Sequence, residues 1–244
     1  MNHVAGLQAP ASRQFRIYVI ALFLRDGQSA TMTARGSNQT ARRMFEALEA
    51  VYRAFEMPPP TIIEGCPCCI ASCGTDVLLT TPLRLITGQS LWRYVSGAFL
   101  TVGNKQDFRY LLPRILDVSV SDGSNANDPE IVLGKLSLAG WQEWKQNEQV
   151  VIKAFIDTWF EHALLNDLAE ANDGPIGWEA ESVLCGAARA GLPLERWLRR
   201  LIEPDAAPVL KDLKERFPSA LSGFWDDVPN RFQEFRAILT QGQA

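Results

Sequence analysis

Four of the five cysteines of this 244-residue chain lie within eight residues, in the stretch GCPCCIASCG. They follow the pattern C-P-C-C-x-x-x-C and are Cys66, Cys68, Cys69 and Cys73. Thiolates are preferred zinc ligands, and four of them can close a tetrahedral site. Structural zinc sites usually draw on two separated pairs, so three of these cysteines with a distant ligand, His162 or Cys185, form the alternative set. The spacing predicts a zinc site at Cys66, Cys68, Cys69 and Cys73.

The same stretch contains a CxxC motif, Cys66-Pro-Cys-Cys69, which is typical of thiol–disulfide exchange. At a helix start the first thiol has a lowered pKa, and a second thiol resolves the mixed disulfide. Cys66 would then attack, and Cys69 or Cys73 would resolve. The motif resembles the Cys-Pro-x-Cys of glutaredoxin-like proteins, whose fold needs strands after the motif, whereas helical patterns follow here. Helical alkylhydroperoxidase D-like proteins place a histidine after CxxC, where this chain has Cys73.

In a third interpretation the cysteines neither bind zinc nor exchange disulfides, and they only pack. Cysteine behaves as a small apolar residue, and the neighbours Ile70, Ala71 and Gly74 are also small or apolar. Such a stretch can fill a crowded turn between helices. The residues therefore leave zinc binding, disulfide exchange and packing open.

Other residue patterns give little support to an enzyme. The chain lacks HExxH, G-x-S-x-G and a phosphate-binding glycine loop followed by lysine. Asp157 and Glu161 lie one helical turn apart and are expected to form a solvated stripe. Trp141 and Trp144 are expected to pack at a helix junction, with an aromatic binding hot spot as the alternative. We therefore expect no hydrolytic activity.

Composition and charge restrict the class of partner. The hydrophobic fraction of 47% fits a globular protein with a core, and the formal net charge is −4. Residues 1–43 carry six arginines against Asp26 alone, so the remaining chain is acidic and nucleic acid is not expected as a partner. The apolar run IYVIALFL (17–24) is far shorter than the roughly 20 residues that span a bilayer. An odd number of cysteines favours a reducing, cytoplasmic location.

Apolar residues recur at helical spacing through most of the chain after residue 36. A first helix begins near Ser37, with Ser37 or Asn38 as its cap, and ends before Pro58-Pro59-Pro60. A short extended piece at 61–63 and a helix that begins at Thr81-Pro82 follow. Further helices are expected at 89–101, 107–118, 129–139, 148–165, 179–190, 193–202, 205–217 and 229–240. The pattern predicts an all-α fold of nine or ten short helices, either a bundle or an irregular stack of helix pairs.

The chain also resembles a known group of sequences in four segments. These are EGCPCC (64–69), DFRYLLPRIL (107–116), EIVLGKLSLAGW (130–141) and SGFWDD (222–227). The resemblance is to a bacterial all-helical family without an established activity, and it covers roughly residues 40–240. It implies a bacterial cytosolic protein with one helical unit, and a basic leader that lies outside the family.

Together these features predict an N-terminal extension at 1–36, which adds a strand or short helix or has little order, and one helical domain at 37–244. We expect a non-enzymatic interaction or scaffold protein that binds another protein through helices after residue 75. Its cysteine cluster would be structural or would bind zinc. The alternative is a thiol–disulfide redox protein that uses Cys66 and Cys69.

Overall fold

The computed structural model describes residues 32–66, 74–123, 125–171, 176 and 178–241. Helix α2 (Met32–Ala54) comes first and turns its apolar stripe inward, with Met44, Leu48 and Val51 buried. The chain then leaves the helix ahead of three consecutive prolines, which cannot continue it. Residues 61–66 are extended and form one isolated bridge between Gly65 and Val102.

The next helices are short until α6. Helix α4 (Thr75–Thr80), the 3-10 turn η1 (Leu83–Leu85) and helix α5 (Gly88–Gly97) lead into α6 (Lys105–Ser121). Asn104 caps α6, because its side chain accepts the Gln106 and Asp107 backbone N–H groups while the Asp107 carboxylate accepts the Asn104 N–H. Helix α6 therefore begins where the free backbone N–H groups of its first turn can donate to the Asn104 side chain.

The middle of the chain forms the longest helix. Helix α7 (Pro129–Ala139) begins with proline in its first turn and ends at Gly140, whose φ of 67° suits glycine. The turn η2 (Trp141–Glu143) then leads into α8 (Gln146–Glu170). Helix α8 buries its apolar side chains against α2 on one side and α9 on the other.

The remaining helices complete the C-terminal part. They are α9 (Glu179–Arg189), α10 (Glu195–Leu201), α11 (Ala207–Arg216) and α12 (Pro229–Leu239), with the 3-10 turns η3 (Pro204–Ala206) and η4 (Gly223–Asp227) between them. Helix α9 is buried over most of its length, and Gly186 lets it approach α7 closely. A Cβ atom at Gly186 would lie 2.7 Å from the Pro129 carbonyl oxygen.

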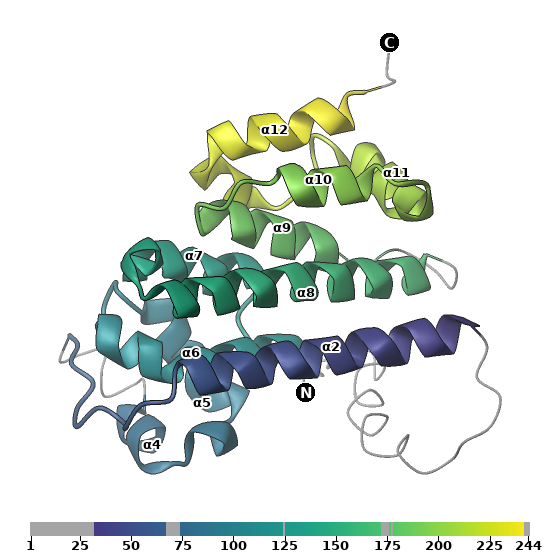
Figure 1. Cartoon of the computed structure of the whole chain (residues 1–244). Coiled ribbons are helices and arrows are strands. Elements are labelled where there is room, and N and C mark those ends of the chain that lie inside the picture. Colours follow the sequence, from purple (N-terminus) through teal and green to yellow (C-terminus); the bar gives the residue numbers. More distant parts are fainter. Residues whose placement is uncertain (1–31, 67–73, 124, 172–175, 177, 242–244) are drawn as a thin grey trace, which may run out of the picture.

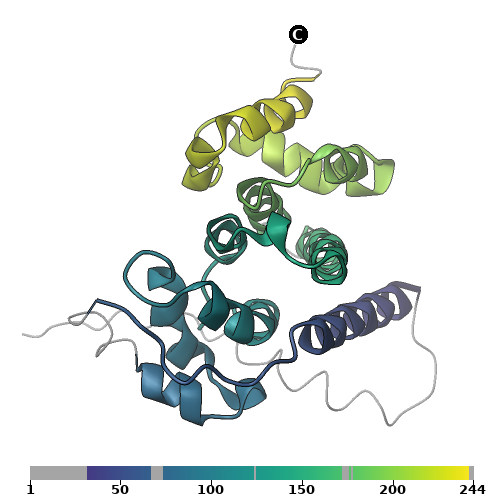
Figure 2. The same cartoon turned by 60° about the vertical axis from the view of Figure 1, so that its left-hand side comes forward.

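The helices stack in layers from one end of the molecule to the other (Figure 1). Helices α4 and α5 form one end, α2 and α6 follow, and α7 and α8 come next. Helix α9 lies on the α7–α8 layer, and α10, α11 and α12 complete the other end (Figure 2). Helices α2 and α8 run side by side in opposite directions.

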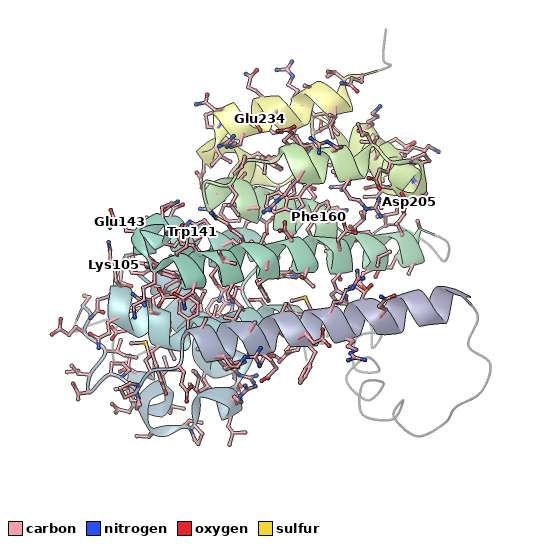
Figure 3. All side chains as sticks on the ribbon, viewed as in Figure 1. Lys105, Trp141, Glu143, Phe160, Asp205 and Glu234 are labelled. Carbon is pink, nitrogen blue, oxygen red and sulfur yellow. The ribbon has the colours of Figure 1, made fainter. Side chains whose placement is uncertain are left out.

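One continuous apolar core links these layers. Trp141 and Phe160 lie inside the stack, whereas Asp205 and Glu234 are on the outside of the C-terminal layers (Figure 3). Trp141 also donates its indole N–H to the Ala190 carbonyl oxygen over 2.8 Å, which joins η2 to the end of α9. The prediction that Trp141 and Trp144 pack at a helix junction is confirmed, because they are 2% and 8% exposed.

The predicted all-α fold is confirmed, and the described residues contain ten α-helices and no strand. Two details of the prediction are wrong. Helix α2 begins at Met32 and passes through Ser37 and Asn38, so neither residue caps it. The helix expected to begin at Thr81-Pro82 is only the turn η1. No described helix is long and apolar enough to span a bilayer.

Candidate functional site

Cys66 is the one cysteine of the predicted cluster that lies in the described part of the chain. Its backbone N–H donates to the Thr101 carbonyl oxygen over 2.8 Å, and the Gly103 N–H donates to the Glu64 carbonyl oxygen over 2.6 Å. These two bonds fix the segment before Cys66 on the turn between α5 and α6. Gly65 permits this approach, because a Cβ atom there would lie 2.8 Å from the Thr101 oxygen.

Cys66 is exposed, so it does not fill the interior of a crowded turn. Cys68, Cys69 and Cys73 fall outside the described residues, and the predicted zinc and disulfide chemistry falls there with them. Among the residues that the structure describes, no group of three or more His, Cys, Asp or Glu side chains is placed to hold a metal ion.

The two distant ligands considered for zinc lie on other helices. Cys185 is completely buried in α9, where burial and the nearby Glu130 and Glu181 raise the pKa of its thiol well above the ordinary value. His162 is half-buried on α8. Both lie on other helices than α5 and α6, whose connecting turn holds Cys66.

Two polar side chains are buried at the base of the turn that holds Cys66. The Tyr94 hydroxyl has no hydrogen-bond partner among the residues that the structure describes, and a Cβ atom at Gly103 would lie 2.8 Å from it. Asp107 is 1% exposed, and burial raises the pKa of its carboxyl group, with the charge of Glu64 acting in the same direction. A buried cation lies beside the same turn, because Lys135 of α7 donates to the Ser96 and Ala98 carbonyl oxygens over 3.2 and 2.9 Å. The buried surroundings of the turn therefore contain groups of both charges.

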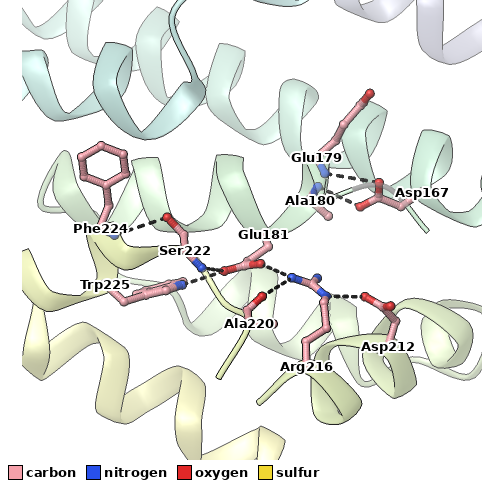
Figure 4. A network of polar contacts seen from close by, with 10 residues as sticks. All are labelled: Asp167, Glu179, Ala180, Glu181, Asp212, Arg216, Ala220, Ser222, Phe224 and Trp225. Carbon is pink, nitrogen blue, oxygen red and sulfur yellow. Dashed lines mark hydrogen bonds and ion pairs between the residues drawn. The ribbon is translucent and has the colours of Figure 1, made fainter. Parts of the chain in front are cut away.

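A larger polar network lies around α9 (Figure 4). Glu181 is buried, and its Oε2 lies 2.6 Å from Arg216 Nη1 of α11. Its Oε1 accepts the Ser222 backbone N–H over 2.7 Å and the Trp225 indole N–H over 3.1 Å. Asp212 accepts from Arg216 Nε over 2.8 Å. Both carboxylate oxygens of Glu181 are therefore satisfied, as a stable buried charge requires.

A second buried carboxylate, that of Asp167 on α8, lies at the first turn of α9. Its carboxylate accepts the Ala180 N–H over 2.9 Å and the Glu179 N–H over 3.3 Å, so an α8 side chain caps α9. Burial raises the pKa of Asp167 to about 7, although the two N–H groups favour the charged form. The charges of Glu179 and Glu170 raise it further.

Glu130 is the third buried carboxyl group beside α9. It extends from α7, is 5% exposed and has one oxygen without a hydrogen-bond partner in the described part of the chain. Burial raises its pKa, while hydrogen bonds from Ser182 and Ser222 act against that shift. Glu181 and Asp167 hold helix ends and loops together, so their geometry is that of a structural network.

The predicted stripe on α8 is solvated, with Asp157 and Glu161 41% and 43% exposed, but its two carboxylates also have partners. Asp157 Oδ2 lies 2.9 Å from Arg196 Nη1, and Glu161 lies 3.3 Å from Arg200 Nε, so both carboxylates pair with α10. Sequence spacing placed them correctly on one face of a helix. It could not identify a partner helix that starts more than thirty residues later.

Exposed apolar side chains are concentrated in the segment of the chain that runs from residue 62 to residue 100. Of the eleven large apolar side chains that are exposed in the described residues, five come from positions 62–100. They are Ile62, Val77, Leu85, Trp92 and Leu100, which are between 47% and 71% exposed. Helices α4 and α5, which carry two of them, pack against each other.

An open hollow with a volume of about 480 Å³ lies beside Ile62. Its lining, among the described residues, is Thr61, Ile62, Ile63, Gly74, Thr75, Asp76 and Leu79. The hollow brings the extended segment before Cys66 next to α4. We call Ile62, Val77, Trp92 and Leu100 the α4–α5 surface. Sequence reasoning missed it, because helical spacing does not distinguish an exposed leucine from a buried one.

Comparisons with known proteins add no relative to this description. Neither a protein-family model, nor a curated protein, nor a solved structure matches the chain. The resemblance to a bacterial family and its EGCPCC motif stays a prediction.

Proposed function

We propose that this chain is a non-enzymatic interaction protein that binds another protein through the α4–α5 surface. The observation that carries the proposal is the concentration of exposed apolar side chains there, with Leu100 at 71% and Ile62 at 61% exposed. Clusters of large apolar side chains on an otherwise polar surface mark binding sites, whereas single ones are ordinary. Trp92, which is 49% exposed, belongs to the residue type most common among interface hot spots.

The nearby cysteines would support this surface. In this proposal Cys66, Cys68, Cys69 and Cys73 stabilise the segment between the extended strand-like piece and α4, either by packing of the last three or by binding zinc. The acidic main body argues against nucleic acid as the partner. The odd number of cysteines supports a reducing compartment, and we place the interaction in the cytoplasm.

The experiment is site-specific photo-crosslinking in cells that produce the protein. A photoreactive amino acid at Leu100 should give one dominant adduct with another protein, and the same probe at Ile202 should give none. Ile202 is a matched control because it is also apolar and 52% exposed, but it lies at the end of α10. Addition of Val77→Asp should reduce the Leu100 adduct at least tenfold, and Val150→Asp should not.

Two outcomes would contradict the proposal. Equal adducts from positions 100 and 202 would mean that the α4–α5 surface is not selective. Persistence of the adduct in the Val77→Asp chain would mean that the contact does not use this surface. The identified partner, once purified, should bind the unmodified chain and lose at least tenfold in affinity for the Val77→Asp chain.

The exposure of Cys66 favours one second candidate, a thiol–disulfide redox protein in which Cys66 attacks and Cys69 or Cys73 resolves. The test is the rate of reaction with 5,5′-dithiobis(2-nitrobenzoate) in the folded chain. A redox role requires a fast phase that Cys66→Ser abolishes and that Cys185→Ser, at a buried position, leaves unchanged.

Elemental analysis of freshly purified protein separates this candidate from a zinc site. About one zinc per chain, with thiols that become reactive only after a chelator is added, would support the metal and exclude free exchange. An absence of zinc together with a fast Cys66 phase would support the redox protein.

A further inference from the structure

We infer that Glu130 keeps its proton in the folded protein at pH values where an exposed glutamate is ionised, and that loss of this proton releases residues 222–227 from α7 and α9. These residues are Ser222 and the turn η4, and we call them the latch. The latch is closed while Glu130 is protonated and opens as the pH rises. It is independent of the α4–α5 surface, with which it shares no residue.

The Glu130 side chain is buried without a cation. It extends from the first turn of α7 and is 5% exposed, and its Oε2 has no hydrogen-bond partner among the described residues. In that part of the chain no arginine or lysine side chain pairs with the carboxyl group, which accepts side-chain hydrogen bonds from Ser182 and Ser222. A carboxylate that is buried without a cation loses its hydration, so such a group binds a proton instead.

The cation that lies beside Glu130, Arg189 of α9, is engaged elsewhere. Its Nη1 donates to the backbone carbonyl oxygen of Glu130 over 2.6 Å, and its Nη2 lies 2.9 Å from Asp227 Oδ2. Its guanidinium also lies 4.4 Å from the centre of the Phe224 ring. The arginine therefore joins α7 and α9 to the latch. Because Asp227 balances its charge, the Glu130 carboxyl group is left without a counter-ion.

Ser222, the first residue of the latch, contacts two buried carboxyl groups. Its backbone N–H donates to Glu181 Oε1 over 2.7 Å, and its hydroxyl forms a hydrogen bond with Glu130. Glu181 can stay charged, because its Oε2 lies 2.6 Å from Arg216 Nη1 (Figure 4). An ionised Glu130 would place a second negative charge beside Ser222 that no cation compensates, and the two carboxylates would repel each other.

The latch is the part of this contact that can move. Helices α7 and α9 touch through their backbones, since a Cβ atom at Gly186 would lie 2.7 Å from the Pro129 carbonyl oxygen. Ser222, by contrast, is half-buried, and η4 is a short 3-10 turn. Water therefore reaches an ionised Glu130 most readily when the latch lifts. The same movement exposes Cys185, which is 0% exposed and forms a hydrogen bond with Ser222.

The direction of the pH dependence follows from the charges around Glu130. Burial raises its pKa above the ordinary value of 4.5, and the charge of Asp128 acts in the same direction. A group whose pKa is raised on folding stabilises the closed state below its ordinary pKa and loses this contribution as the pH rises through the folded value. The other charged or titratable groups of the surrounding elements are Asp167 of α8, Glu181, Cys185 and Arg189 of α9, Arg216 of α11 and Asp227 of η4.

The test uses Cys185 as a reporter of opening. The folded protein is treated with iodoacetamide at several pH values between 5 and 8, and peptide mass spectrometry gives the modification rate of residue 185. Division by the rate for the urea-unfolded chain at the same pH corrects for ionisation of the exposed thiol, so the ratio gives the open fraction. We expect this ratio to rise at least fivefold over the range, since release of one proton on opening contributes roughly tenfold per pH unit at most.

Three variants assign the rise to one group. Glu130→Gln cannot ionise, so its ratio should change less than twofold over the same range. Glu143→Gln, at an exposed position in η2, is the matched control and should keep the full rise. Asp167→Asn should keep it as well, because Asp167 accepts from the first turn of α9 rather than from the latch. A rise that Glu130→Gln keeps, or that Asp167→Asn abolishes, would overturn the inference.

The proton itself can be observed without any substitution. In carbon-13 NMR of the unmodified protein, the Glu130 carboxyl resonance should titrate at a higher pH than that of the exposed Glu143, and its curve should coincide with the rise in Cys185 modification. A Glu130 midpoint equal to or below that of Glu143 would overturn the inference. So would a modification ratio for Cys185 that stays constant with pH.

Discussion

Arg216 of α11 and Glu181 of α9 form a buried ion pair, with Nη1 of the arginine 2.6 Å from Oε2 of the glutamate. Their side chains are 12% and 2% exposed, and Glu181 also accepts hydrogen bonds from Ser222 and Trp225 (Figure 4). One carboxylate therefore holds α11, the following loop and η4 against α9.

Replacement of Arg216 by methionine should destabilise the protein strongly. The variant would keep a buried Glu181 carboxylate without its cation, which costs about 3–5 kcal/mol in the free energy of unfolding. Urea unfolding followed by tryptophan fluorescence measures the change. Arg199→Met is the control, because its pair with Glu195 is exposed and contributes about 0–1 kcal/mol. Equal stability of the two variants would show that the buried pair contributes no more to the free energy of unfolding than the exposed pair does.

Replacement of Gly186 by alanine should separate α7 from α9. The new Cβ would lie 2.7 Å from the Pro129 carbonyl oxygen and 2.9 Å from Leu133 Cδ1, and backbone cannot move aside as a flexible side chain can. We expect a loss of about 1–3 kcal/mol in the free energy of unfolding. Gly223→Ala, where nothing lies within 4 Å of the new Cβ, should change stability by less than about 0.5 kcal/mol.

Local signals predicted most of the fold. Pro129 and Gly140 lie within one turn of the two ends of α7, so the expected range of 129–139 can be read from neighbouring residues. Helix α4 gave no such signal. Its six residues, TDVLLT, include three β-branched residues with little helix preference, and burial of Leu78 in the tertiary structure supports it.

The sites were harder to predict than the helices. Glu181 and Arg216 are separated by 35 residues, and each looks like an ordinary surface charge in the sequence. The same holds for Asp157, whose partner Arg196 belongs to another helix. Which charges are buried depends on how helices cross. The cysteine motif, by contrast, was visible at once, but Cys66 alone places it on the turn after α5.

Replacement of Gly65 by alanine should release the segment before Cys66. The added Cβ would lie 2.8 Å from the Thr101 carbonyl oxygen, so the two segments must move apart. The Cys66 N–H would then lose its bond to the Thr101 oxygen, a loss of about 1 kcal/mol. Faster amide exchange at Cys66, with little change at α12, is the expected signature. Gly123→Ala, which meets nothing within 4 Å, should leave exchange at Cys66 unaltered.

Asp167 should make stability depend on pH. Its pKa of about 7 in the folded protein lies above the ordinary value of 3.8, so the folded state binds a proton that the unfolded state has already released between these pH values. The free energy of unfolding should therefore fall as pH rises from about 4 to 7, by at most about 1.4 kcal/mol per pH unit from this group.

Asp167→Asn removes that proton while its side-chain oxygen can still accept the Ala180 N–H. Urea unfolding at pH 5, 6, 7 and 8 should show a smaller decline for this variant than for the unmodified chain, with the largest relative gain at pH 7 and above. Glu195→Gln is the control, since Glu195 is 81% exposed and should leave the slope as it is. If the Asp167→Asn chain declines as steeply as the unmodified one, the α9 cap is ionised throughout this range and the decline has another source.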